Sequence, residues 1–251
     1  MSWTADGAKR ADDRSERRGG QAEAAYREIE ERIVTLRIPP GTLLSEQTLA
    51  RALSIGRTPI REALQRLSHH GLVHVLPHRG VFVSEIDVTR QLRMVELRRE
   101  VEQLVVRAAC RRGSDPQCRA LDAMADQLEE AAAAEDDTRF IRLDRDMNAL
   151  LYAMADNEFA TRTMLLVSGL TRRFWYLVHS RKEGVSQGGV KTCALLHADI
   201  ARAVARRDSH ASSACVSRLL DYIEELSRAG LETLPGRARD AAADRLADIR
   251  A

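Results

Sequence analysis

Arginine and glutamine side chains recur at helical spacing near the start of the chain. Arg57, Arg61 and Gln65 are four residues apart, so they share one face of a helix that begins near Thr58. The opposite, apolar face comprises Ile60, Ala63, Leu64 and Leu67. The planar guanidinium of arginine matches two acceptor atoms of guanine at once. The pattern therefore predicts a helix that presents base-contacting side chains to DNA, with a merely solvated basic face as the alternative.

The segments on both sides of this helix predict the elements that hold it. Ser45 is expected to cap a preceding helix, and Ile55-Gly56 forms the turn between the two helices. After Gly71 the segments LVHVLP and VFVS predict a β-hairpin that turns at His78-Arg79-Gly80. An earlier helix stops at Pro39-Pro40-Gly41. Its apolar face comprises Tyr26, Ile29, Ile33 and Leu36. This order of elements is typical of a winged helix-turn-helix, which places its second helix in the major groove.

Charge is concentrated locally rather than spread over the chain. The net charge of +2 is too small for indiscriminate binding of nucleic acid. Residues 45–84, however, contain five arginines and two glutamates, a surplus of three that suits a few phosphate contacts. Gln47 and Thr58 can hydrogen-bond phosphates or bases. Gly80 allows the wing backbone to approach DNA closely beside the charged Arg79.

The motifs of this region resemble the winged helix-turn-helix of the GntR family of bacterial transcription regulators. The resemblance covers about sixty residues and rests on Pro39-Pro40-Gly41, Leu44-Ser45-Glu46, Leu49-Ala50, Arg57-Thr58-Pro59, Arg61-Glu62-Ala63-Leu64 and Gly71-Leu72-Val73. It implies DNA contacts by Arg57, Thr58, Arg61 and the wing residues Arg79 and Gly80. Gln47 stands where these regulators often carry arginine, and Gly56 where serine or threonine is usual. Two phosphate contacts of the family are therefore expected to be missing.

From Asp87 onward the hydrophobic pattern is helical throughout, which predicts an all-α second domain. The apolar stripe of its first helix comprises Met94, Leu97, Val101, Leu104 and Ala108. Ser114-Asp115-Pro116 opens the next helix. We expect a disordered tail over residues 1–20, the winged helix-turn-helix over 21–86, the helical domain over 87–234 and a loose tail over 235–251.

The helical region resembles the FCD domain, a bundle that dimerises and holds an effector, often beside a metal ion bound by one aspartate and three histidines. The two resemblances imply a mainly α chain: an N-terminal winged helix-turn-helix with a small β-ribbon, followed by an all-α FCD-type bundle. The four metal positions fall on Asp144, Asn148, His197 and Leu219. Leucine cannot ligate a metal and asparagine is a poor zinc ligand, which leaves Asp144 and His197 as candidate ligands. A hydrogen-bonded pocket role for His197 is preferred, unless His179 or Cys193 completes a zinc site.

Without a metal ion, the candidate effector-binding residues are Arg98, Asp144, Asn148 and His197. Arg98 lies where FCD domains place an arginine near the cavity, so the resemblance implies that it pairs with a carboxylate through two hydrogen bonds. A salt bridge with Glu102, four residues along the helix, is the alternative. The resemblance therefore implies a small organic acid or a related metabolite as the effector.

Other classes of protein find less support in the sequence. The cysteines, at positions 110, 118, 193 and 215, lack metal-binding spacing and are expected to be reduced thiols of a cytoplasmic protein. No apolar run is long enough to cross a membrane, and no phosphate-loop, nucleophile-elbow or zinc-protease motif predicts an enzyme. We interpret the chain as a homodimeric transcriptional regulator of an inverted-repeat operator, modulated by a small metabolite. An effector-blind DNA-binding dimer and a helical metal enzyme are the alternatives.

Overall fold

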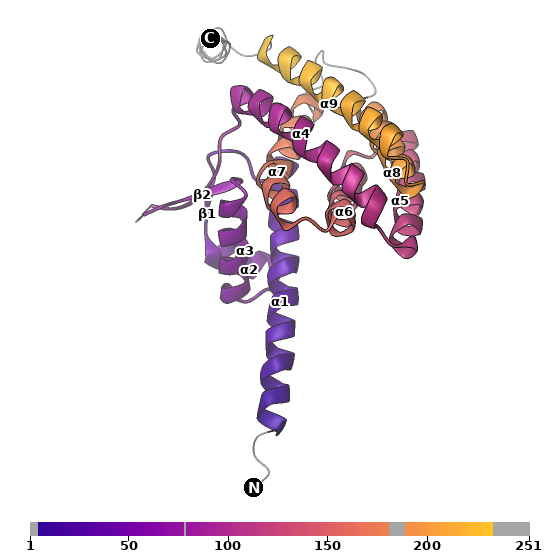
Figure 1. The fold of residues 1–251 in the computed structure, drawn as a ribbon. Coiled ribbons are helices and arrows are strands. Elements are labelled where there is room, and N and C mark those ends of the chain that lie inside the picture. Colours follow the sequence, from indigo (N-terminus) through magenta and orange to yellow (C-terminus); the bar gives the residue numbers. More distant parts are fainter. Residues whose placement is uncertain (1–4, 78, 181–188, 233–251) are drawn as a thin grey trace. The chain divides into compact units, whose positions relative to one another are not determined.

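The structure is a computed structural model that describes residues 5–77, 79–180 and 189–232 of the 251-residue chain. Contacts divide it into two compact units, and the division falls between Glu85 and Ile86. The sequence predicted this boundary one residue later. Figure 1 shows the elements of both units.

The described part of the first unit contains helices around a small sheet. In order these elements are α1 (Ala5–Val34), β1 (Leu43–Leu44), α2 (Glu46–Leu53), α3 (Arg57–His69), β2 (Val73–Leu76) and β3 (Gly80–Val83). The strands are antiparallel in the order β1-β3-β2, with Val73 opposite Val83 and Leu76 opposite Gly80. The predicted winged helix-turn-helix with its β-ribbon is confirmed. Strand β1 was not predicted, because two residues are too short to show an alternating pattern.

Local sequence signals explain how α3 is held. Its predicted apolar face is buried throughout, as are Ile29 and Ile33 of α1, which packs against α3. The Ser45 side chain accepts a hydrogen bond from the backbone N–H of Thr48 and so caps α2. The apolar stripe therefore fixes which face of α3 remains exposed.

The N-terminal segment differs from the prediction. Residues 1–20 were expected to be disordered, but α1 extends back to Ala5. Composition explains the difference, because the segment contains alanine, lysine, arginine and glutamate, which have favourable helix propensities. Residues 1–4, His78 and the predicted tail over 235–251 lie outside the described residues.

The described part of the second unit is all-α, as predicted. Its helices are α4 (Val88–Arg112), α5 (Asp115–Ala134), α6 (Asp137–Ala155), α7 (Glu158–Ser180), α8 (Gly189–Ala205) and α9 (Ser209–Glu232). Helix α4 packs against α6, α7 and α9, while α8 packs against α5 and α9. The predicted start of α5 is confirmed, because Ser114 and Gln117 form a capping box there. Among the described residues, no helix combines the length and hydropathy needed to cross a membrane.

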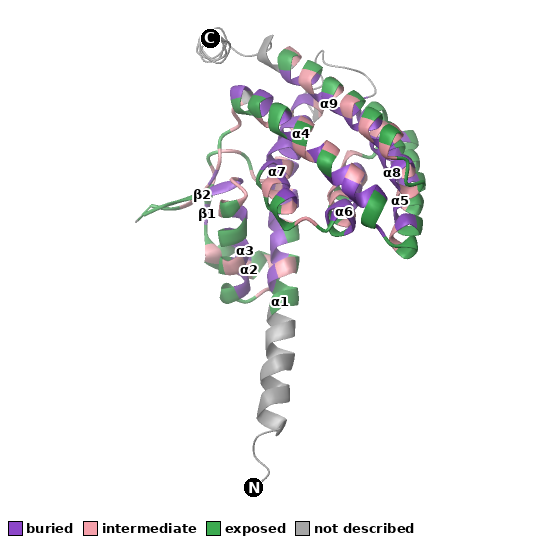
Figure 2. Ribbon diagram, in the orientation of Figure 1, coloured by how far each residue is buried: buried purple, intermediate pink, exposed green. Residues whose placement is uncertain are grey.

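Helix α4 buries a different face from the one its apolar stripe suggests (Figure 2). Of the five stripe residues, Leu97 and Leu104 are 42% and 39% exposed, two others are half-buried, and Ala108 is buried. The charged residues Arg98 and Glu102 are buried instead. They tolerate burial because Arg98 Nε donates to Glu102 Oε1 at 2.6 Å, so each charge compensates the other. Apolar side chains of α4 consequently remain on the surface.

Candidate nucleic-acid interface and helical-domain pocket

The exposed face of α3 carries the polar residues that the sequence singled out. Arg57, Thr58, Arg61 and Gln65 are all exposed. The helix begins after Gly56, whose position provides no side-chain cap. Backbone N–H groups at an uncapped helix N-terminus are suitable donors for a phosphate. Pro59 has no N–H, so Arg57 and Thr58 supply the backbone donors of the first turn of α3, and Arg61 follows in the second turn.

Arg61 is not independent of its neighbours. Its Nε and Nη2 donate to the two carboxylate oxygens of Glu46 on α2, at 3.1 and 3.0 Å. The hydrogen bond from Arg61 lowers the pKa of Glu46. This pair uses one edge of the guanidinium and leaves the edge formed by Nη1 and the second N–H of Nη2 to other acceptors, on a side chain that is 63% exposed. Sequence spacing gave no sign of the pair, because its partners are on different helices.

The remaining predicted DNA-contact residues lie on α2 and the hairpin. Gln47 is exposed on α2, and Arg79 and Gly80 are exposed where β3 begins. Gly80 has a φ of 106°, and an added Cβ would lie 2.8 Å from Leu43 Cδ1. The backbone conformation of the wing therefore requires glycine at this position.

The second unit contains a pocket lined by α4, α6, α7, α8 and α9. The space among the lining side chains is about 410 Å³, counting the part that is open to solvent, and its enclosed part has room for about two to three water molecules. The predicted effector residues Arg98, Asp144, Asn148 and His197 all line this pocket. Such a volume suits a ligand of a few heavy atoms.

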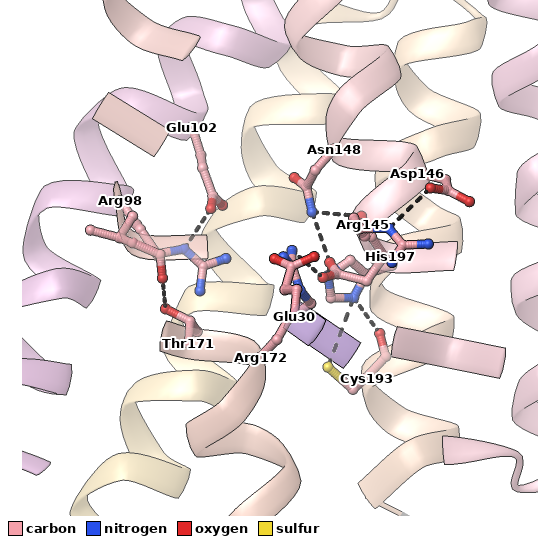
Figure 3. A network of polar contacts seen from close by, with 12 residues as sticks. Glu30, Arg98, Glu102, Arg145, Asp146, Asn148, Thr171, Arg172, Cys193 and His197 are labelled. Carbon is pink, nitrogen blue, oxygen red and sulfur yellow. Dashed lines mark hydrogen bonds and ion pairs between the residues drawn. The ribbon is translucent and has the colours of Figure 1, made fainter. Parts of the chain in front are cut away.

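Asp144 lies at the centre of a buried hydrogen-bond cluster. Its Oδ1 accepts from Asn148 Nδ2 at 2.8 Å and lies 3.0 Å from His197 Nε2, and its Oδ2 is 3.3 Å from Arg172 Nη1. Figure 3 shows Asn148, Arg172 and His197 pointing toward one another. Burial alone would raise the pKa of Asp144, but the hydrogen bond from His197 and the charges of His197, Arg172 and Arg98 hold that pKa well below its usual range. We call these four residues, Asp144, Asn148, Arg172 and His197, the Asp144 cluster.

The two ring nitrogens of His197 both face acceptors. Nδ1 lies 2.7 Å from the carbonyl oxygen of Cys193, and Nε2 lies 3.0 Å from the Asp144 carboxylate. A carbonyl and a carboxylate can only accept, so both nitrogens donate and the imidazole is positively charged. Burial opposes this charge, but contacts with Cys193 and Asp144 raise the pKa of His197 well above 6.5.

The residues at the family's metal positions do not fit a transition-metal ion. An imidazole that donates from both nitrogens has no lone pair for a metal, and Asp144 already accepts from protein donors. Leu219 is buried and offers no ligand. His179 points elsewhere, to the Trp175 carbonyl and the Tyr222 hydroxyl. Within the described ranges, no three His, Cys, Asp or Glu side chains are grouped so as to hold a metal ion.

Other pocket residues carried no sequence signal. Arg172 adjoins a second arginine, and nothing in their spacing distinguished the one that enters the pocket. Tyr152 and Trp175 also line the pocket and were not predicted. For Arg98 the two predicted roles are compatible, because its Nε is paired with Glu102 while its Nη1 has no hydrogen-bond partner among the described groups.

Comparison with known proteins places the chain in a family. The model for bacterial regulatory proteins of the gntR family matches residues 21–83, and the FCD domain model matches residues 93–222, more than half of the chain. The chain belongs to the GntR family. Similar GntR regulators include the HTH-type transcriptional repressor RspR of Escherichia coli K12, which is 29% identical over 206 residues, 81% of this chain and 87% of that protein. The Nta operon transcriptional regulator of Aminobacter aminovorans is 32% identical over 138 residues, 54% of this chain and 64% of that one.

Solved structures of GntR proteins share the fold. Escherichia coli McbR/YncC superposes with a TM-score of 0.66 at 18% identity, covering 84% of this chain and 98% of that one. A putative GntR regulator from Rhodococcus sp. RHA1 has a TM-score of 0.60 at 22% identity, with 86% and 100% covered. Its domains and relatives identify this GntR chain as a transcriptional regulator rather than a member of an enzyme family.

Proposed function

We propose that this GntR regulator binds an inverted-repeat operator as a homodimer, and that a small organic acid in the helical-domain pocket modulates its affinity for DNA. The observation that carries the DNA-binding part is the exposed face of α3. Arg57, Arg61 and Gln65 project there from a helix whose opposite face is buried. Exposed arginines at a helix N-terminus are suited to guanine contacts in the major groove.

Exposed apolar residues of the second unit support the homodimer. Leu97 and Leu104 are exposed on α4 and do not line the pocket, and Leu166 is 49% exposed on α7, which packs against α4. Large apolar side chains exposed on helices that pack against one another are typical of a protein interface. A two-fold dimer would present two α3 helices to the two halves of an inverted repeat.

The pocket supports modulation by a ligand. If the protein were an effector-blind dimer, side chains would be expected to fill the core of the bundle. Here a cavity reaches Arg98, Asn148 and His197. Polar groups that converge on a largely apolar cavity are typical of a small-molecule site.

Selection from a random duplex library with the purified protein tests the DNA-binding proposal. We expect an enriched inverted repeat, and we expect Arg57→Ala to weaken binding to it by about tenfold or more per half-site. Arg111→Ala, at an exposed arginine of the second unit, is the matched control and should leave the affinity unchanged. Enrichment of no motif, or equal affinity of the Arg57→Ala variant, would contradict the proposal.

The homodimer is tested by light scattering coupled to size exclusion. A Leu97→Glu/Leu104→Glu variant should elute as a monomer and bind the operator more weakly. Leu195→Glu is the control, because Leu195 is similarly exposed at 40% but lies on α8. A dimer that survives the double substitution would show that this face is not the interface.

A further inference from the structure

Three buried hydrogen-bond donors that line the pocket have no partner among the described protein groups. They are Arg98 Nη1, Tyr152 OH and Trp175 Nε1. Their residues are 7%, 6% and 5% exposed. They enter the same pocket from three helices, α4, α6 and α7. Buried polar atoms are almost always paired in folded proteins, so three unpaired donors around one cavity indicate a place for a ligand's acceptor atoms.

The chemistry of these donors restricts the ligand. The guanidinium and the indole can only donate. Burial raises the pKa of Tyr152, so its hydroxyl keeps its proton at neutral pH and is available as a donor. A matching ligand group must therefore offer several lone pairs, and a carboxylate offers about four on two oxygens. Its charge also strengthens the hydrogen bond from Arg98.

Several other polar residues of the pocket are paired with one another. Asn148, Arg172 and His197 all contact the Asp144 carboxylate. A second carboxylate on the ligand would lie near Asp144 or Glu102, which also line the cavity. Like charges at short distance disfavour such a ligand. Phe140 and Ile223 provide an apolar part of the lining.

We infer that the pocket binds a small monocarboxylate without a metal ion, with the carboxylate accepting hydrogen bonds from Arg98, Tyr152 and Trp175 and the hydrocarbon part lying against Phe140 and Ile223. This inference rests on the proposed effector function. It assigns the anchoring role to three donors outside the family's metal positions. Arg98 is the one residue shared with the effector set implied by the resemblance.

Calorimetry on the full-length protein in EDTA tests the ligand class. The probes are the short monocarboxylates acetate, propanoate and butanoate, which match the size of the pocket, and the comparisons are propanamide and succinate. At least one monocarboxylate should bind saturably, and its amide and succinate should bind about tenfold more weakly or not at all. Binding that vanishes in EDTA and returns with zinc would overturn the inference. So would the absence of binding by every monocarboxylate. If the protein binds its operator but none of the monocarboxylates, the regulator function stands and only the ligand assignment fails.

Tyr152→Phe tests the anchor, because it removes a single oxygen atom. The ligand-free variant should unfold at the same temperature or higher, since a buried hydroxyl without a partner is lost. Its Kd for the bound monocarboxylate should rise by about tenfold. Tyr176→Phe is the control on the same bundle, since Tyr176 is half-buried outside the pocket lining. An unchanged Kd in Tyr152→Phe, or a lower unfolding temperature without ligand, would contradict the assignment.

Discussion

Substitution of Glu46 is predicted to reduce the ability of this regulator to distinguish its operator from other DNA. Glu46 accepts from Nε and Nη2 of Arg61 and so holds one edge of the guanidinium. The outer edge, formed by Nη1 and the second N–H of Nη2, is the one that matches O6 and N7 of guanine in an end-on approach. Because the pair exists before DNA arrives, Arg61 loses less conformational freedom on binding.

The expected magnitudes follow from the contacts that each change removes. Under the proposed function, Arg61→Ala deletes one two-point base contact per half-site, which corresponds to about ten- to a hundredfold in affinity. An operator with two half-sites squares this loss to about a hundred- to ten-thousandfold. Glu46→Ala keeps the arginine and removes only its restraint. Exposed ion pairs contribute little, up to about fivefold per half-site, so the ratio of operator to random-DNA affinity should fall by up to about twenty-five-fold.

Fluorescence anisotropy with an operator duplex and a scrambled duplex, at one salt concentration, measures this ratio. Binding of Glu46→Ala to the scrambled duplex should strengthen slightly, because a carboxylate near the phosphates is gone. Glu62→Ala is the control, since it also removes one negative charge, here from α3, and leaves the Glu46–Arg61 pair intact. If Arg61→Ala behaves as expected but Glu46→Ala leaves the ratio unchanged or increases it, Glu46 does not orient Arg61.

The wing, the Asp144 cluster and the cap of α5 each provide a further prediction. Arg79→Ala should weaken binding to operator and scrambled DNA alike and lower the salt slope by about two per dimer, as expected for phosphate contacts; a salt titration measures it, and a loss confined to the operator would argue against a phosphate role. Above pH 6.5 the free energy of unfolding should fall by up to about 1.4 kcal/mol per pH unit, because the unfolded chain releases the His197 proton while the folded chain, with Asp144 beside it, retains it. The stabilisation from the His197 charge is complete below pH 6.5 and is lost as the pH rises through the raised folded-state pKa of His197. Urea unfolding at several pH values should show this decrease in the parent protein and not in His197→Gln. An equal dependence of the free energy of unfolding on pH in both proteins would refute the prediction. Ser114→Ala should lower the free energy of unfolding by about 1 kcal/mol, since it removes the capping box with Gln117; urea unfolding checks this, and an unchanged midpoint would contradict it.

The first unit was predictable because its signals are local. The apolar stripe of α3 is read directly from residues three and four apart, and its burial fixes the exposed face with Arg57 and Arg61. Caps such as Ser45 depend on neighbouring residues alone. The Glu46–Arg61 pair was missed because its two residues are fifteen apart, on separate helices. No periodicity within one helix can indicate such a contact.

The pocket was predictable only in part, for a physical reason. The resemblance to FCD domains predicted Arg98 and Asp144 as pocket residues. The hydropathy pattern, however, predicted that Leu97 and Leu104 of α4 are buried, and both are exposed. Hydropathy counts each charged residue as exposed, whereas Arg98 and Glu102 compensate one another and are buried together. The same limit hides Arg172, whose burial depends on Asp144 in another helix. Paired buried charges become visible only when the tertiary structure brings the partners together.

Under the proposed function, helix α4 is the element through which a ligand in the pocket would influence DNA binding. It begins at Val88, five residues after β3 of the wing ends at Val83, and it carries Arg98 into the pocket. On the pocket side, α6, α7 and α8 are joined by the Asp144 cluster, whereas the Arg98–Glu102 pair lies wholly within α4. A ligand held by Arg98 together with Tyr152 and Trp175 would therefore add a polar link between α4 and helices that are already tied to one another. A ligand changes affinity for DNA only if it binds two arrangements of the protein unequally. Under the proposed function, the two arrangements differ in the placement of α4, and the helix that carries the unpaired guanidinium N–H is also the one that leads directly from the DNA-binding unit.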